Sequence, residues 1–173
     1  MSSIKVYLAR AMSGRSMKEV YYEAKKERQY LERQGFRVLD PVSEEGVRPR
    51  NKNIQATYKE LVKFWKRDKE MIRQANMVFD MTPWLKSEGV AHEIGYARYH
   101  LWKPVFRVYG KEKRPSAGSV AYFEDDVLAK DIDHAIYKAE QMFGTWYKRF
   151  VWRIALYNRC WLKAEWYRLL SWF

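Results

Sequence analysis

The sequence predicts an α/β protein built on a doubly wound parallel sheet of about five strands, followed by a separate C-terminal helix. Short apolar runs, such as residues 4–9 and 77–81, alternate with longer segments in which apolar residues recur at the helical period. Strands that alternate with helices join into a parallel sheet through right-handed crossovers. The tryptophan-rich segment from residue 146 onward lies outside this alternation.

In the first half of the chain, cap and turn residues separate the predicted elements. The pattern predicts strands over residues 4–9 and 36–39 and helices over residues 17–31 and 55–74. Ser16 is a suitable N-cap for the first helix, and Gly35 ends it. Asp40 and Pro41 end the second strand. Residues 42–53 are polar, charged and marked by proline and glycine, so we predict a long loop there.

In the second half, the same reasoning gives the rest of the sheet. The pattern predicts strands over residues 77–81, 104–108 and 119–123, a helix over residues 90–101 and a basic loop over residues 110–118. Asp125 and Asp126 are expected to cap a last helix that begins near Val127. The predicted sheet is Rossmann-like (flavodoxin-like) and occupies one domain over residues 1–145.

The composition indicates a globular protein with an anionic partner. The chain has 173 residues, 47% of them hydrophobic, and a formal net charge of +12. A charge of this size favours nucleotides, nucleic acid or anionic lipid. The single Cys160 excludes an internal disulfide framework and a cysteine-based zinc site. Neither a signal peptide nor an apolar run of the ~20 residues needed for a membrane span is visible, so we expect a cytoplasmic protein.

The predicted extension over residues 146–173 holds five of the eight tryptophans, interleaved with lysine and arginine. On a helical wheel, Phe150, Ile154, Tyr157 and Trp161 share one face. Such a helix suits packing on the domain or on a partner subunit, a membrane interface, or stacking on nucleic acid. Packing is the favoured interpretation.

Glu93 lies in the most informative segment of the chain. The strand over residues 77–81 precedes a loop marked by Pro83, Ser87 and Gly89, so Glu93 is expected in the first turn or so of the next helix. In an open α/β sheet this is the carboxyl-end rim, where ligands bind. A carboxylate there can act on a bound small molecule. The alternative is a glutamate that only complements the helix dipole.

Two further groups are predicted at the same rim. The loop after the first strand carries Ser13, Gly14 and Arg15, whose backbone amides and guanidinium group suit an anion. With a single glycine, this loop is neither a dinucleotide-binding fingerprint nor a Walker loop. Asp68 lies late in the helix that precedes the third strand.

Together these residues resemble the nucleoside 2-deoxyribosyltransferase superfamily, over about residues 4–123. The resemblance rests on Tyr7 with the loop Ser13-Gly14-Arg15, on Asp68, and on the run Ser87-x-Gly-x-x-x-Glu93-Ile-Gly-x-Ala. It is closer to the hydrolytic branch, the 2′-deoxynucleoside 5′-monophosphate N-glycosidases, and to related phage and bacterial proteins.

The resemblance implies that Glu93 is the nucleophile, Asp68 the acid that protonates the departing base, and Tyr7 the residue that orients the nucleophile. Cleavage of an N-glycosidic bond builds positive charge at the sugar C1′, which a nearby carboxylate stabilises and traps covalently. The departing base needs a proton from a second acidic group. Two carboxyl groups suffice for this chemistry, so we expect neither a metal nor a cofactor.

Ser87 implies a (deoxy)nucleoside 5′-monophosphate as the substrate. At this position the transferases of free nucleosides tend to carry an acidic residue, whereas the monophosphate hydrolases carry serine. A carboxylate would repel a phosphate dianion. The implied phosphate ligands are Ser13, Gly14, Arg15, Ser87 and Gly89. Ser116 resembles a further phosphate-binding serine that the family supplies across a subunit interface, which implies a homodimer or larger assembly with shared active sites.

Some positions depart from the family's pattern. Arg10 and Ala11 stand where the hydrolases favour small residues with glycine, and Glu88 suits an anionic ligand only if it points to solvent. Asp80 either caps the following loop or touches the sugar. His92 is expected to point away from Glu93.

Several site residues also have a purely structural interpretation. Asp68 is one charge in a highly charged helical run and is then a solvated surface group. Tyr7 is then a core residue, and Lys86 and Arg15 are surface charges.

The predicted function is therefore N-glycosidic cleavage of a (deoxy)nucleoside 5′-monophosphate. The alternatives are a deoxyribosyltransferase that moves the sugar to another base, a nucleotide-binding module without turnover, and a membrane-surface or nucleic-acid-binding protein that uses the C-terminal helix.

Overall fold

The structure, a computed structural model, describes residues 4–12, 14–45, 57–85, 87–109 and 127–143. Its centre is a parallel sheet in the order β2-β1-β3-β4-β5. The strands are β1 (Lys5–Ala9), β2 (Arg37–Leu39), β3 (Met77–Asp80), β4 (Val105–Val108) and β5 (Val127–Ala129). The helices are α1 (Met17–Arg33), α2 (Pro41–Glu45), α3 (Tyr58–Gln74), α4 (Glu88–Gly95) and α6 (Ile132–Phe143), with a π-helical turn, η1 (Tyr96–His100), after α4. The prediction of an α/β fold with a parallel sheet is confirmed.

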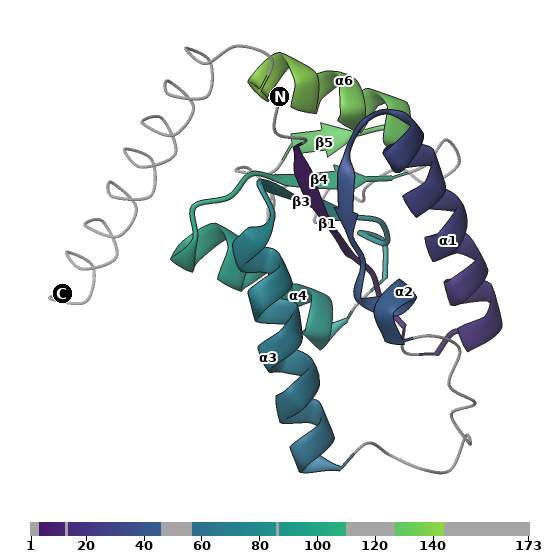
Figure 1. Ribbon diagram of the computed structural model, residues 1–173, viewed down its shortest axis with the longest axis vertical. Helices are drawn as coiled ribbons and strands as arrows, with labels where there is room; N and C mark the ends of the chain where they lie inside the picture. Colours follow the sequence, from purple (N-terminus) through teal and green to yellow (C-terminus); the bar gives the residue numbers. More distant parts are fainter. Residues whose placement is uncertain (1–3, 13, 46–56, 86, 110–126, 144–173) are drawn as a thin grey trace, which may run out of the picture.

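Helices cover both faces of the sheet (Figure 1). Alternate residues of β1 point to opposite faces, because side chains alternate along a strand. Val6 and Leu8 belong to a buried cluster with Leu31 of α1 and Ile136 of α6. Tyr7 and Ala9 belong to a second buried cluster, whose helical members come from α3, α4 and η1: Met71, Ile72, Val90, Ile94 and Ala97. The sheet is therefore doubly wound.

The strand order places a ligand crevice between β1 and β3. The chain moves from β1 outward to β2 and then crosses to β3 on the other side of β1. Ligands bind at such a reversal, beyond the carboxyl ends of the strands. The residues that follow these two strands, Arg10 and Met81, therefore stand at the crevice.

The predicted start of the last helix is wrong. Val127–Ala129 is a strand that pairs with Phe106–Val108 of β4, and the next helix begins at Ile132 rather than near Val127. Asp131 caps the N-terminus of this helix, because its Oδ1 accepts a hydrogen bond of 2.8 Å from the backbone N–H of His134. The predicted strand over residues 119–123, the cap at Asp125 and Asp126, and the tryptophan-rich extension lie outside the described residues.

The predicted loop over residues 42–53 begins instead as a short helix, α2. Asp40 holds its first turn, since its carboxylate accepts hydrogen bonds from the Val42 backbone N–H at 3.1 Å and from the Ser43 hydroxyl at 2.6 Å. The other predicted helices and strands lie within a few residues of their expected positions. None of the helices in the described part of the chain has the length and apolar character to cross a membrane.

Candidate active site

Three elements bring Tyr7, Asp68 and Glu93 to one place. Tyr7 belongs to β1, Asp68 to the last turns of α3 and Glu93 to the second turn of α4. Each of the two carboxyl groups raises the pKa of the Tyr7 hydroxyl, and Asp68 raises that of Glu93. The three side chains expected to carry the chemistry therefore interact electrostatically.

Glu93 is in an unusual state for a glutamate. Its residue is only partly exposed, and loss of hydration is the main cause that raises the pKa of its carboxyl group to about 8. The negative charges of Asp68 and Asp80 raise it further, whereas Tyr7 and Arg67 lower it. In a glutamate that only complements a helix dipole, the pKa would not be raised in this way. A carboxyl group with such a pKa, at the ligand-binding rim, is a candidate for a functional role.

The Tyr7 hydroxyl group lies in the core and makes no hydrogen bond of ordinary geometry to the described residues. Tyr7 is 0% exposed, and its hydroxyl has no hydrogen-bond partner of ordinary geometry among the described residues. Its interaction with Glu93 favours the charged form of that carboxyl group. Burial is the main reason that the pKa of Tyr7 is well above its usual value. The Tyr7 hydroxyl therefore stays protonated at neutral pH, and it lowers the pKa of Glu93.

Asp68 is held by its neighbour Arg67. Nε and Nη2 of Arg67 donate to the same oxygen, Oδ1 of Asp68, at 3.0 and 2.7 Å. Only 14% of the Asp68 side chain is exposed, so it is not the freely solvated helix charge of the alternative interpretation. Sequence reasoning placed Arg67 at the rim together with Asp68 but gave it no role of its own. Its position directly before Asp68 was the available signal.

Asp80 has a structural role in this arrangement. Its Oδ1 accepts a hydrogen bond of 3.0 Å from the Thr82 backbone N–H, and its Oδ2 pairs with Arg107 of β4. The residue is completely buried. Of the two expectations for Asp80, the structure shows the cap of the following loop. The negative charge of Asp80 also raises the pKa of Glu93.

Ser87 forms the start of the helix that carries Glu93. Its Oγ accepts a hydrogen bond of 3.4 Å from the Val90 backbone N–H, as an N-cap does. Gly89 lies in the first turn, and Glu88 is exposed, as an anionic ligand at this end would require. Because Ser87 caps the helix, α4 begins at Glu88 and Glu93 lies in its second turn rather than its first.

Two of the other predicted phosphate ligands, Gly14 and Arg15, lie directly before α1. Gly14 has a φ of 74° at the turn into α1, a conformation that suits glycine. Arg15 forms an ion pair of 2.6 Å with Glu23 of α1. Ser13, Lys86 and Ser116 lie outside the described residues. His92 is exposed, and its ring lies 6.3 Å from that of Trp65.

No group of three or more potential metal ligands occurs within the part of the chain that the structure describes. The arrangement consists instead of two carboxyl groups, a tyrosine hydroxyl and an arginine at the carboxyl end of a parallel sheet. Such a set can donate a proton to a leaving group and present a carboxylate to an electrophilic carbon.

One comparison with known proteins gives a match over most of the chain. A family model described as nucleoside 2-deoxyribosyltransferase matches residues 6–138. No curated protein matches the chain at a significant level.

Among solved structures, the fold is similar to that of a 2-deoxyribosyltransferase from the psychrotolerant bacterium Bacillus psychrosaccharolyticus. That match has a TM-score of 0.53 and 20% identity, and it covers 76% of this chain and 89% of the other. A conserved protein from Enterococcus faecalis V583 matches with a TM-score of 0.54 and 17% identity, over 82% of this chain and 100% of the other. A CMP N-glycosidase from Clostridium botulinum matches more weakly, with a TM-score of 0.46 and 14% identity over 79% and 98% of the two chains.

Proposed function

Since this chain belongs to the nucleoside 2-deoxyribosyltransferase family, we propose that it cleaves the N-glycosidic bond of a (deoxy)nucleoside 5′-monophosphate. Glu93 is the nucleophile, Asp68 the general acid and Tyr7 the residue that orients Glu93. The observation that carries the proposal is the interaction of two carboxyl groups from α3 and α4 around the buried Tyr7 hydroxyl.

The reaction proceeds in two displacements at the sugar C1′. A carboxylate oxygen of Glu93 forms a bond to C1′ as the C1′–N bond breaks, and the electron pair leaves with the base nitrogen, which takes the proton of Asp68. Water then attacks C1′ and gives a proton to the Asp68 carboxylate, and the bond to Glu93 breaks. The product sugar phosphate keeps the configuration of the substrate at C1′.

The two carboxyl groups must hold a single proton between them. The first step needs a charged Glu93 and a protonated Asp68, and two charged carboxylates this close would repel each other. In the unliganded protein Glu93 has a pKa of about 8, and Arg67 donates two hydrogen bonds to Asp68. The proton therefore rests mainly on Glu93 near neutral pH. Productive binding has to move it to Asp68.

The position of Ser87 supports a phosphorylated substrate. Its hydroxyl accepts from the Val90 backbone N–H and keeps its own proton for a phosphate oxygen. The N-terminus of α4, with the Gly89 amide in its first turn, favours negative charge.

The decisive experiment measures release of the free base, by chromatography, from ribo- and deoxyribonucleoside 5′-monophosphates and from the matching nucleosides. The wild-type protein should release a base from at least one monophosphate. Glu93→Gln should lower that rate by at least about a thousandfold. Glu140→Gln is the matched control, since Glu140 is an exposed glutamate on α6, and this variant should keep the wild-type rate.

Two outcomes would change the proposal. Base release only when a second base is present, with a new nucleoside as product, would identify the protein as a transferase that uses the same residues. No release from any compound, with or without an acceptor base, would leave a nucleotide-binding module. Ser87→Asp should weaken turnover of monophosphates but not of nucleosides, and an equal effect on both would contradict the phosphate role.

A further inference from the structure

The first turns of α3 project from the body of the protein. Figure 1 shows them extending past α2 and α4. The two buried residues of α3, Met71 and Ile72, lie at the other end of the helix. Near the middle of α3, the ring of Trp65 lies 6.0 Å from that of Tyr96 in η1, so the helix packs on the protein from this point onward. We call residues 58–66 the α3 tip.

The α3 tip exposes apolar side chains. Tyr58 is 81% exposed and Leu61 is 53% exposed. The two residues are three positions apart, so they are neighbours on one face of the helix. Neither belongs to the buried clusters that the described residues form. Exposed apolar side chains that are rimmed by polar residues are typical of a contact with a protein or a membrane.

Three lysines flank these apolar side chains. Lys59, Lys63 and Lys66 are exposed and follow the spacing i, i+4 and i+7, so they share one face of the helix. They form no ion pair with any other residue that the structure describes. Glu60, the carboxylate within the tip, is engaged in the capping box, where its Oε2 accepts from the Thr57 backbone N–H at 2.8 Å. The α3 tip is therefore basic and amphipathic.

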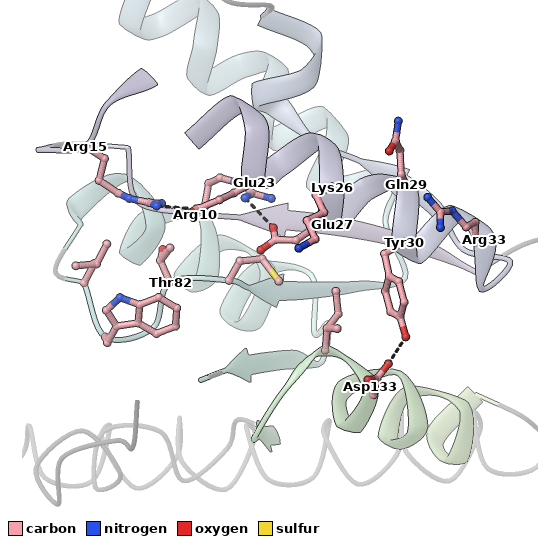
Figure 2. A pocket seen from close by; sticks show the side chains of 14 residues that line it. Arg10, Arg15, Glu23, Lys26, Glu27, Gln29, Tyr30, Arg33, Thr82 and Asp133 are labelled. Carbon is pink, nitrogen blue, oxygen red and sulfur yellow. Dashed lines mark hydrogen bonds and ion pairs between the residues drawn. The ribbon is translucent and has the colours of Figure 1, made fainter. Parts of the chain in front are cut away.

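The basic residues near α1 are in a different situation. Arg10 lies 2.8 Å from Glu27, and Arg15 lies 2.6 Å from Glu23 (Figure 2). Carboxylates of α1 thus neutralise the arginines beside them. The lysines of the α3 tip have no such partner among the described residues, so their positive charge is available to an anionic surface.

The side chains of the α3 tip favour a lipid surface over other partners. A second copy of the same face would place lysines against lysines, which is unfavourable. Nucleic acid is bound best by the planar guanidinium group of arginine. Within α3, Arg67 already pairs with Asp68. Arg73 already pairs with Glu70.

The exposed Leu61 also points to lipid rather than nucleic acid, because an aliphatic side chain offers no ring on which a base can stack. A bilayer surface accepts both components of the tip at once. Apolar side chains enter the interface, while lysines contact anionic headgroups.

We propose that the α3 tip binds the surface of an anionic lipid bilayer. Tyr58 and Leu61 enter the boundary between headgroups and acyl chains, and Lys59, Lys63 and Lys66 contact the charged headgroups. This contact is reversible and does not depend on the proposed reaction.

The test is co-sedimentation of the full chain with vesicles of phosphatidylcholine alone and of equal parts phosphatidylcholine and phosphatidylserine. The wild-type protein should bind the mixed vesicles, and added salt should weaken this binding because it screens the lysines. Lys59→Gln/Lys63→Gln/Lys66→Gln should lower the partition coefficient at least about tenfold. Tyr58→Gln/Leu61→Gln should also lower it at least about tenfold, through lost apolar contact.

Two matched controls exclude general effects of charge and of exposed rings. Lys18→Gln/Lys25→Gln/Lys26→Gln makes the same change in net charge with exposed lysines of α1. Tyr22→Gln/Tyr137→Gln removes two tyrosines that are 71% and 59% exposed on α1 and α6. Both controls should bind the mixed vesicles like the wild type. Circular dichroism should show an unchanged fold in every variant, because all substituted residues are exposed.

Several results would overturn the proposal. They are no binding of the wild type to mixed vesicles, wild-type binding by the variants of the α3 tip, and equal losses in these variants and their controls. Loss of binding to single-stranded DNA with vesicle binding intact would instead make the tip a nucleic-acid surface. A changed sedimentation coefficient with vesicle binding intact would make it a contact between copies of the chain.

Discussion

The hydroxyl of Thr82 accepts a hydrogen bond of 2.7 Å from the backbone N–H of Ala11, a residue 71 positions earlier in the chain. This bond ties the segment after β3 to the segment after β1, which are the two sides of the ligand crevice. Both residues are buried, so water cannot replace the acceptor.

Thr82→Val should therefore destabilise the protein by about 1–3 kcal/mol, since it leaves the Ala11 N–H buried without an acceptor. Valine keeps the shape of threonine, so the change isolates the hydrogen bond. Urea unfolding measures the effect. Thr82→Ser keeps a hydroxyl and should lose clearly less stability. If the serine and valine variants were equally destabilised, the hydroxyl would not be the important group.

The buried pair of Asp80 and Arg107 should behave as a unit. Arg107→Met leaves the Asp80 charge buried without its partner and should cost about 3–5 kcal/mol. Asp80→Asn keeps an oxygen for the Thr82 N–H but removes the negative charge that Asp80 places beside Arg107. The double variant removes both charges, so its loss should be smaller than the sum of the two single losses. A double-mutant cycle in urea checks this, and additive losses would show that the two charges do not depend on each other.

Glu93 should make the protein less stable as the pH rises. Its pKa is about 8 in the folded state, against an ordinary value of 4.5, so the folded protein holds more protons than the unfolded chain between these values. Stability contributed by the protonated group is present below pH 4.5 and is lost as the pH rises toward 8. Glu93→Gln does not titrate and cannot lose this contribution. Between pH 5 and pH 9 its free energy of unfolding should therefore rise relative to that of the wild type. The rise should be at least about 1.4 kcal/mol, which is the equivalent of one pKa unit. Urea titrations at the two pH values test this, with Glu140→Gln as the variant that should run parallel to wild type.

Arg67 should set the pH dependence of the proposed reaction. Its positive charge lowers the pKa of Glu93 and holds Asp68 through two donated hydrogen bonds. Arg67→Gln should therefore raise the pKa of Glu93 and move the acid limb of the kcat/KM profile to higher pH. Arg67→Lys should lie between the variant and wild type. Arg73→Gln, an exposed arginine on the same helix paired with Glu70, should leave the profile in place. A shift toward lower pH in Arg67→Gln would contradict this account.

Buried apolar strands and periodic helices were predictable, whereas β5 and α2 were not. The central strands could be identified because each is a buried apolar run, and α1 and α3 because their apolar residues recur at the helical period. β5 has only three residues, too few to show an alternation, and the acidic pair before it imitates a helix cap. For α2, Asp40 followed by Pro41 was a readable start signal, since proline suits the first helical position.

For the candidate site, sequence identified residue types but not their partners. The resemblance gave Tyr7, Asp68 and Glu93, and the structure brings them together. It could not indicate that Arg15 pairs with Glu23, because the direction of a side chain after a strand depends on register. Nor could it indicate that the Asp80 carboxylate is neutralised by Arg107, a residue on a different strand.

The dimensions of the sheet restrict how copies of this protein can associate. β2 and β5 are its two edge strands, and each has only three residues. Edge strands this short expose few unpaired peptide groups, so they are poor templates for strand addition and for amyloid-like growth. Among the residues that the structure describes, assembly should therefore form through helices and side chains rather than by extending the sheet from one copy into the next.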